Sequence, residues 1–234
     1  MAGYREHISV SGVLGASYGV GAVFVLGFTP VQGALAGILT WVAGMLPDLD
    51  SVSGRPVREI FGLLAAVTPF VLMQHLSDWA GDPEGAILLG VLTYAVIRYG
   101  GAMLLAKVAV HRGMFHSIPA LLIAAEAAYL GYKHESVTVK LLMGIGVALG
   151  FLSHLVLDEM YSVQWAGIRL KLNKAAGSAM KFTGKRLMPN VITYALLSLL
   201  TYTILVDVGV LEDPVKKNRS PLLQHAAEQL PTLN

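Results

Sequence analysis

Residues 140–158 read KLLMGIGVALGFLSHLVLD, an apolar stretch with ionisable side chains only at Lys140, His154 and Asp158. A helix that crosses a bilayer needs about 20 mostly apolar residues, so this stretch predicts a transmembrane helix. Further apolar segments lie at 8–28, 31–46, 60–76, 85–106, 117–132 and 190–211. We therefore expect an all-α fold, a polytopic transmembrane bundle of about six to seven helices.

The composition favours the same class of protein. Apolar residues make up 55% of the 234-residue chain, charged residues make up 14%, and the mean hydropathy is +0.62. Soluble domains carry roughly 25% charged residues, so a bilayer suits this chain better than water. The chain has no cysteine, which excludes disulfides and thiolate ligands and leaves nitrogen and oxygen donors for any metal ion.

We expect one membrane-embedded helical domain over residues 1–211 and a polar tail over residues 212–234. The segments 31–46, 60–76 and 117–132 are short, so they predict either tightly fitted spans or helices that end inside the bundle. Within the domain, residues 162–189 combine basic side chains with apolar ones at helical spacing. That pattern predicts an amphipathic helix in the headgroup region, and a basic cytoplasmic loop is the alternative.

Basic side chains gather in three connections, at 47–59, 107–116 and 159–189. The positive-inside rule assigns these connections and the N-terminus to the cytoplasm. A seventh span at 190–211 would then leave a basic tail outside the cell. A re-entrant segment is the alternative for these residues.

His154 and Asp158 close the apolar stretch four residues apart, so they share one face of the predicted helix. Such a pair can bind one metal ion, or the carboxylate can orient the imidazole. Ionisable groups in a membrane helix are costly, which makes them candidate functional residues. A simple hydrogen bond within the bundle is the alternative.

Two carboxylates, Asp48 and Asp50, follow Pro47 at the end of an apolar segment. The proline ends the helix, because the residue before a proline is pushed out of the helical region. The two carboxylates can face one or two cations, since close carboxylates repel unless a cation or a proton separates them. A solvated acidic helix end is the alternative.

His111 and His116 flank Arg112 and Gly113 just before segment 117–132. Their spacing, with a glycine between them, indicates a turn and not one helix face. Neutral imidazoles are common ligands for Zn, Mn and Fe, and a guanidinium group binds phosphate through two hydrogen bonds. A basic loop that happens to contain histidine is the alternative.

Under the predicted orientation, four separate pieces of chain bring these side chains to the cytoplasmic face. We therefore predict a site for a divalent metal ion, with Zn as the first choice and Mn or Fe as alternatives. The candidate ligands are His7, Asp48, Asp50, His111, His116, His154 and Asp158. Glu6 and Glu159 adjoin this set, and either could act as a general base on a water molecule at the metal.

The motifs together resemble the YdjM family of bacterial inner-membrane proteins, described as LexA-binding, membrane-bound, metal-dependent hydrolases. The shared features are an early histidine, LPDxD, HRGxxHS and SHxxxD, in that order, over about residues 7–160. The resemblance implies a multi-pass helical bundle related to the zinc-dependent phospholipase C fold, with a metal site lined by the seven candidate ligands. After Asp158 this chain departs from the family pattern and reads EMYSVQW at 159–165, which affects the rear of the pocket.

We expect a membrane-bound metal-dependent hydrolase that acts on a phosphoester, with a membrane lipid as one candidate substrate, at the cytoplasmic face. Asp50 would bridge two cations, Arg112 would neutralise developing charge, and Glu159 would be the base. The alternative is a non-catalytic scaffold whose structural metal or polar site docks a cytoplasmic protein. A transporter would need ionisable groups near the bilayer midplane, whereas here they cluster at helix ends, which argues against this class of protein. We expect no direct binding of nucleic acid.

Overall fold

The computed structural model describes residues 3–50, 55–101, 103, 114–166, 169–172, 180–184 and 186–212. Its α-helices are α1 (Tyr4–Phe24), α2 (Pro30–Ala43), α3 (Arg55–Val71), α4 (Met73–Ala80), α5 (Pro83–Ala95), α7 (Ile118–Gly131), α8 (Val137–Ser162) and α9 (Leu187–Asp207). A 3-10 helix η1 (Pro47–Asp50) follows α2, and a π-helix η2 (Val96–Gly101) follows α5. The short strands β1 (Val163–Ala166) and β2 (Arg169–Leu172) follow α8. The described part of each predicted apolar segment is therefore mainly helical, as expected.

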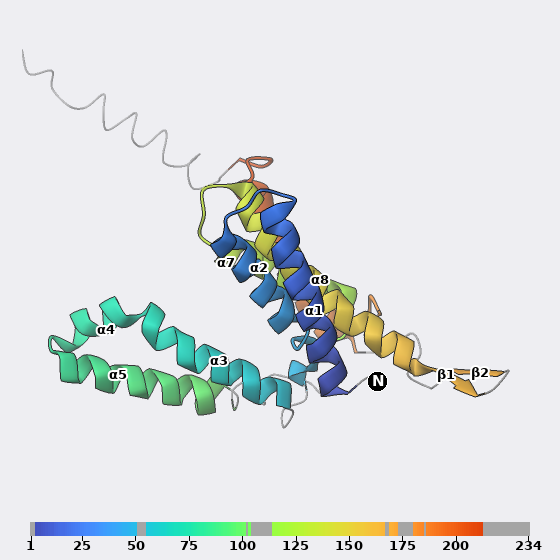
Figure 1. The fold of residues 1–234 in the computed structure, drawn as a ribbon, viewed down its shortest axis with the longest axis horizontal. Coiled ribbons are helices and arrows are strands. Elements are labelled where there is room, and N and C mark those ends of the chain that lie inside the picture. The colour runs from blue at the N-terminus through green and yellow to red at the C-terminus, as the bar shows by residue number, and fades with distance from the viewer. Residues whose placement is uncertain are drawn as a thin grey trace, which may run out of the picture.

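The helices α1, α2, α7, α8 and α9 form a bundle (Figure 1). Helix α8 is its centre, because it contacts α1, α2 and α7, and α9 packs on the outer side of α7. Chain direction alternates, so the start of α1 and the ends of α2 and α8 meet at one end of the bundle. We call this the site end, and we call the opposite end, where α8 begins and α9 finishes, the far end.

Glycines allow α1 and α2 to approach closely. A Cβ atom on Gly19 would lie 2.6 Å from the carbonyl oxygen of Gly33, and one on Gly15 would overlap the carbonyl oxygen of Gly37. Small residues at such positions let helix backbones touch in a membrane, where apolar burial drives association little. The buried residues of α1 form one stripe: His7, Ser11, Gly15, Gly19 and Ala22. The face of α1 that packs on the bundle therefore carries His7 at its beginning.

Helix α8 packs against α2 in the same way. A Cβ atom on Gly150 would overlap the carbonyl oxygen of Thr40, and one on Gly146 would lie 3.1 Å from that of Ala36. Met143 and Leu155 of α8 are fully buried on either side of this contact. These close approaches fix the position of the end of α2 relative to the last turns of α8.

Helices α1, α8 and α9 are long and apolar enough to cross a membrane, and α2 and α7 are shorter apolar helices. These features agree with a helical membrane protein. In the described part of the chain the long apolar helices are fewer than the six to seven spans predicted, so that number is not confirmed. Helix α9 runs without a break to the far end, where Asp207 accepts a hydrogen bond from Tyr129 at 2.8 Å.

The described residues of the predicted segments 60–76 and 85–106 do not join the bundle. They form an arm of α3, α4, α5 and η2 that leaves the site end and packs on itself (Figure 1). Gly81 ends α4 with a φ of 76°, and Asp82 caps α5 by accepting a hydrogen bond from the Gly85 N–H at 2.7 Å. Phe70 and Trp79 are among the exposed apolar side chains of this arm. The hydrophobic pattern of the sequence could not distinguish the helices of the arm from those of the bundle, because an apolar helix can contact lipid as well as protein.

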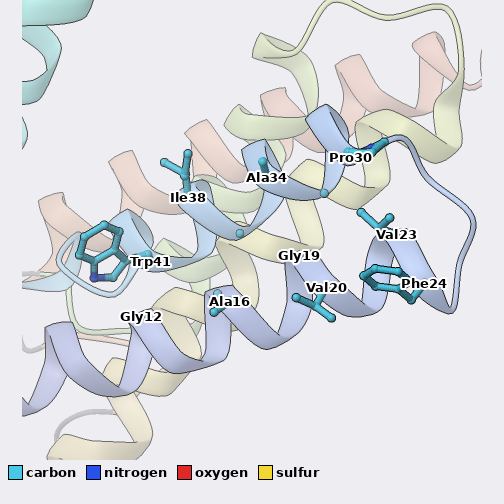
Figure 2. Close-up of a pocket in the computed structure, with 13 residues that line it drawn as sticks. Gly12, Ala16, Gly19, Val20, Val23, Phe24, Pro30, Ala34, Ile38 and Trp41 are labelled. Carbon is cyan, nitrogen blue, oxygen red and sulfur yellow. The ribbon is translucent and has the colours of Figure 1, made fainter.

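An apolar groove of about 540 Å³ runs along the outer side of the α1–α2 pair (Figure 2). Its lining is mostly glycine, alanine and aliphatic side chains, with Phe24 and Trp41 at its two ends. The Trp41 indole N–H donates to the carbonyl oxygen of Ile8 at 3.0 Å and ties α2 to α1. None of the candidate metal ligands that the structure describes lines this groove, so it is separate from the site described below.

The prediction of an amphipathic helix over residues 162–189 is wrong for Val163–Ala166 and Arg169–Leu172. Strands β1 and β2 form an antiparallel hairpin there, with Val163 opposite Leu172 and Ala166 opposite Arg169. The sequence RLKL at 169–172 alternates basic and apolar residues with a period of two, which favours a strand over a helix. Residues 173–179 lie outside the described part of the chain.

Candidate metal centre

Four pieces of the chain meet at the site end and bring histidine and aspartate side chains together. Helix α1 contributes His7, η1 contributes Asp48, the turn before α7 contributes His116, and α8 contributes His154 and Asp158. The structure thus assembles five of the seven candidate ligands into one cluster. It confirms that side chains distant in the sequence gather at one end of the helices.

His154 lies at the centre of the cluster and is fully buried. Its Nδ1 lies 2.7 Å from the carbonyl oxygen of Gly44, at the end of α2. The last carbonyls of a helix have no partner within the helix, so Nδ1–H donates here and the lone pair is left on Nε2. Among the described residues, Nε2 of His154 is buried and has no hydrogen-bond partner. A buried acceptor of this kind is what a metal ion would complete.

Asp48 faces His154 because α2 stops just before it. The helix ends at Ala43, and Pro47 opens the 3-10 turn that carries Asp48. Its Oδ1 lies 3.6 Å from Nε2 of His154 and 3.5 Å from Nε2 of His116. Burial raises the pKa of the Asp48 carboxyl, but the hydrogen bond from His116 and the neighbouring imidazoles lower it, and the net pKa is below its ordinary value. The carboxylate form is therefore favoured at this position.

His116 is held by the beginning of α7. Ser117 caps that helix, its hydroxyl accepting a hydrogen bond from the Ala120 N–H at 3.2 Å. The next residue, Ile118, donates its N–H to the carbonyl oxygen of Lys181 at 3.1 Å. Both contacts fix the backbone beside His116, whose Nε2 lies 3.8 Å from Oδ2 of Asp158. Its ring stands at 63° to that of His154.

Asp158 connects the cluster to α1 through His7. Its Oδ1 lies 3.2 Å from Nε2 of His7, and its Oδ2 lies 3.8 Å from Nε2 of His154. The His7 and His154 rings are stacked, with centroids 3.6 Å apart and planes at 9°. Both carboxylate oxygens thus face imidazole nitrogens, and Asp158 is only 3% exposed.

The spacing of the donor atoms fits a single small cation. Ligand atoms around a tetrahedral Zn²⁺ with bonds of about 2.0–2.2 Å lie roughly 3.4 Å from one another. The nitrogen–oxygen separations among Asp48, His116, His154 and Asp158 range from 3.5 to 3.8 Å. Two overlapping triads each bring their donor atoms within 4.8 Å of one another. They are His7, His154 and Asp158, and Asp48, His116 and His154.

The other predicted site residues are not part of this described cluster. The backbone of Asp50 belongs to η1, but its side chain lies outside what the structure describes, as do His111 and Arg112. Glu159 is half-buried on α8, and neighbouring positions on a helix point about 100° apart, so it does not share the face of Asp158. Glu6 is exposed and belongs to neither triad.

One functional contact was missed in the sequence, namely the carbonyl of Gly44 that orients His154. Every residue carries a carbonyl, so no residue type could have marked it. Gly44 itself lies so close to Ser11 of α1 that a Cβ atom would overlap the serine side chain. Only the packing of α2 between α1 and α8 identifies this position.

Comparison with known proteins gives one family. The model of a family described as YdjM inner membrane protein matches residues 13–172, which is more than half of the chain. The match includes Asp48, His116, His154 and Asp158 and begins after His7. Searches of curated proteins and of solved structures gave no significant match.

Proposed function

This chain belongs to the YdjM inner membrane protein family, and from that premise we propose that it is a membrane-bound metal-dependent hydrolase acting on a phosphoester. The observation that carries the proposal is the buried Nε2 of His154, which has no hydrogen-bond partner among the described residues and faces two carboxylates. Burying such a group without a partner is costly, so an ion that binds it would be strongly favoured.

The donor set fits a divalent transition metal. Two imidazoles and two carboxylates suit Zn first and Mn or Fe as alternatives, and the hydrogen bond from His154 to Gly44 is the kind that orients a metal-binding histidine. A divalent ion in such a site supplies Lewis acidity for a phosphoryl oxygen and makes a nearby water molecule more acidic. Asp48, as a carboxylate, would hold the ion and accept a hydrogen bond from that water molecule.

The position of the cluster supports a membrane phosphoester as the substrate. It lies at the ends of α1 and α8, two helices long enough to cross a membrane, where lipid headgroups are expected. Asp48 is the most exposed of the five described ligand candidates, with 31% of its side chain accessible, so a substrate would approach from the side of η1. Lipid at this depth would reach the site without leaving the bilayer.

Several finer predictions belong to this proposal. They are a multi-pass topology with the site end in the cytoplasm, a relationship to the zinc-dependent phospholipase C fold, and roles for Asp50, Arg112 and Glu159 in catalysis. Arg112 would neutralise charge on a phosphoryl group, as guanidinium groups do in phosphate recognition.

A non-catalytic scaffold that docks a cytoplasmic protein is the second candidate function. The observation in its favour is how closed the cluster is, with His154 fully buried and His116 only 8% exposed. Structural metal sites are closed, whereas catalytic sites keep an open position for water or substrate. The accessible edge of Asp48 favours the hydrolase over this alternative.

Elemental analysis and a hydrolysis assay on the detergent-purified protein test the proposal. We expect bound Zn, Mn or Fe, and cleavage of a p-nitrophenyl phosphodiester or of phospholipid in mixed micelles. His154→Ala should abolish both, while His75→Gln on the exposed surface of the arm serves as the matched control. Bound metal without cleavage of any phosphoester would favour the scaffold, and activity that survives His154→Ala would disprove the assignment.

A further inference from the structure

The stacked imidazole rings of His7 and His154 at the site end cannot both bind one ion. The lone pair of an imidazole nitrogen lies in the plane of its ring, so an ion bound to histidine lies close to that plane. The planes of His7 and His154 are nearly parallel, at 9°, and their centroids are 3.6 Å apart. Such planes do not meet within the reach of an ion. An ion in the plane of His154 therefore lies well off the plane of His7.

The ring of His116 is inclined to the ring of His154 and is not stacked on it. Their planes cross at 63°, so one ion can lie in both planes. Each Nε2 is also at a similar distance from Oδ1 of Asp48, 3.5 Å for His116 and 3.6 Å for His154. Oδ2 of Asp158 lies 3.8 Å from each of the two nitrogens. Asp48, His116, His154 and Asp158 thus form a set of four donors around one point.

A second ion beside His7 would have few ligands. The triad of His7, His154 and Asp158 needs the same Nε2 of His154 that the other triad uses. Nδ1 of His154 is already bonded to the carbonyl oxygen of Gly44, so the ring has a single nitrogen to offer. Among the described residues, an ion at His7 would be left with His7 and Asp158.

We infer that His7 is not a metal ligand but a positioning residue that donates a hydrogen bond from Nε2 to Oδ1 of Asp158 and stacks on His154. The inference rests on the proposed metal site. The contact of 3.2 Å uses one oxygen of Asp158 and leaves Oδ2 directed at His116 and His154. The stacked ring also prevents His154 from rotating, so His7 orients two ligands at once. Residues that orient ligands typically change metal affinity 10–100-fold when they are removed.

The test compares His7 variants with ligand variants in the full-length, detergent-purified protein loaded with Co²⁺. The visible absorption bands of Co²⁺ report the number and type of its ligands, and titration gives the stoichiometry and affinity. In His7→Gln the amide can still donate to Asp158, and in His7→Phe the stacking remains but the donor is lost. His116→Ala is the ligand variant, and His75→Gln on the arm is the control.

We expect both His7 variants to bind one Co²⁺ with the wild-type bands. Affinity should fall about 10–100-fold in His7→Phe and clearly less in His7→Gln, because Gln restores the donor. His116→Ala should alter the bands or lose the ion. If His7→Phe does not fold, His7→Gln is sufficient to test whether His7 is a ligand. Replacing a true imidazole ligand with an amide would change the absorption bands of Co²⁺.

Altered bands or lost stoichiometry in His7→Gln would overturn the inference. A wild-type protein that binds Co²⁺ but cleaves no phosphoester would disprove the hydrolase proposal, while the bands would still decide the role of His7. A wild-type protein that binds neither Co²⁺ nor Zn²⁺ would overturn both.

Discussion

The two ends of the bundle each bury polar side chains, yet the two clusters are balanced differently. At the far end, the ammonium group of Lys140 contacts the Asp207 carboxylate and lies 4.6 Å from the centre of the Tyr129 ring. Tyr129 donates to the same carboxylate, so cation, anion and donor are all supplied by the protein. This cluster joins α7, α8 and α9 and needs nothing from outside.

The described contacts at the site end are of a different kind. Its carboxylates, Asp48 and Asp158, face imidazole nitrogens at distances of 3.2 to 3.8 Å. Nε2 of His154 is buried without a hydrogen-bond partner in the described part of the chain. Burial of polar groups alone therefore does not mark a functional site. The feature that supports the proposed metal site is a buried acceptor, Nε2 of His154, with no hydrogen-bond partner among the described residues.

The largest expected effect is the loss of bound metal in His154→Ala/Asp158→Ala. Removing two of four donors should leave the protein metal-free by elemental analysis, whereas Lys140→Met at the far end should keep the wild-type content. Chelation should also destabilise the wild type, by about 2.7 kcal/mol if the metal had been present at 100 times its Kd. Equal metal content in the two variants would remove the distinction between the ends.

Gly150→Ala should disturb the site end through packing. The added Cβ would overlap the carbonyl oxygen of Thr40 and push α2 away from α8 one turn before His154. Overpacking of this kind typically costs about 1–3 kcal/mol, which thermal unfolding in detergent would measure, and metal affinity should fall as well.

Gly21→Ala is the matched control on α1, because nothing lies within 4 Å of its added Cβ. It should be neutral or stabilise the protein by up to about 1 kcal/mol, since glycine is less favourable than alanine in a helix interior. A larger loss of stability in Gly21→Ala than in Gly150→Ala would contradict the close approach of α2 and α8.

Lys140→Met should destabilise the far end without affecting the metal. The carboxylate of Asp207 would lose its cation, at a cost of about 1–2 kcal/mol, reduced because its side chain is 34% exposed. The double variant Lys140→Met/Asp207→Leu should recover part of this loss in thermal unfolding. A fall in metal affinity in either variant would show that the two clusters are coupled.

The smallest effect is expected in the arm. Asp82→Ala removes the cap of α5 and should cost about 1 kcal/mol, because the Gly85 N–H loses its acceptor. Hydrogen exchange should become faster in α5, while α8 and the bound metal remain unchanged. Asp82→Asn, which keeps a capping oxygen, is the control. Faster exchange in α8 would contradict an arm that packs mainly on itself.

Much of this organisation could be predicted from local sequence patterns. The apolar segments predicted helices, and the spacing of His154 and Asp158 predicted that they share a face of α8, where the structure has both side chains buried. Alternating chain direction then brought Asp48, His116 and His7 to the same end. The helix predictions succeeded because helix period and helix length depend on residues that are neighbours along the chain.

Local sequence patterns were enough to predict a helical membrane protein with metal-type side chains at one end of its helices. Tertiary packing was needed to show that α3 and α5 form an arm, that Val163–Ala166 pairs with Arg169–Leu172, and that His7 stacks on His154. Whether an apolar helix contacts lipid or protein depends on its neighbours, since both are apolar. The plane of a histidine ring likewise depends on how α1, α2 and α8 pack together, and no local pattern of residues encodes that angle.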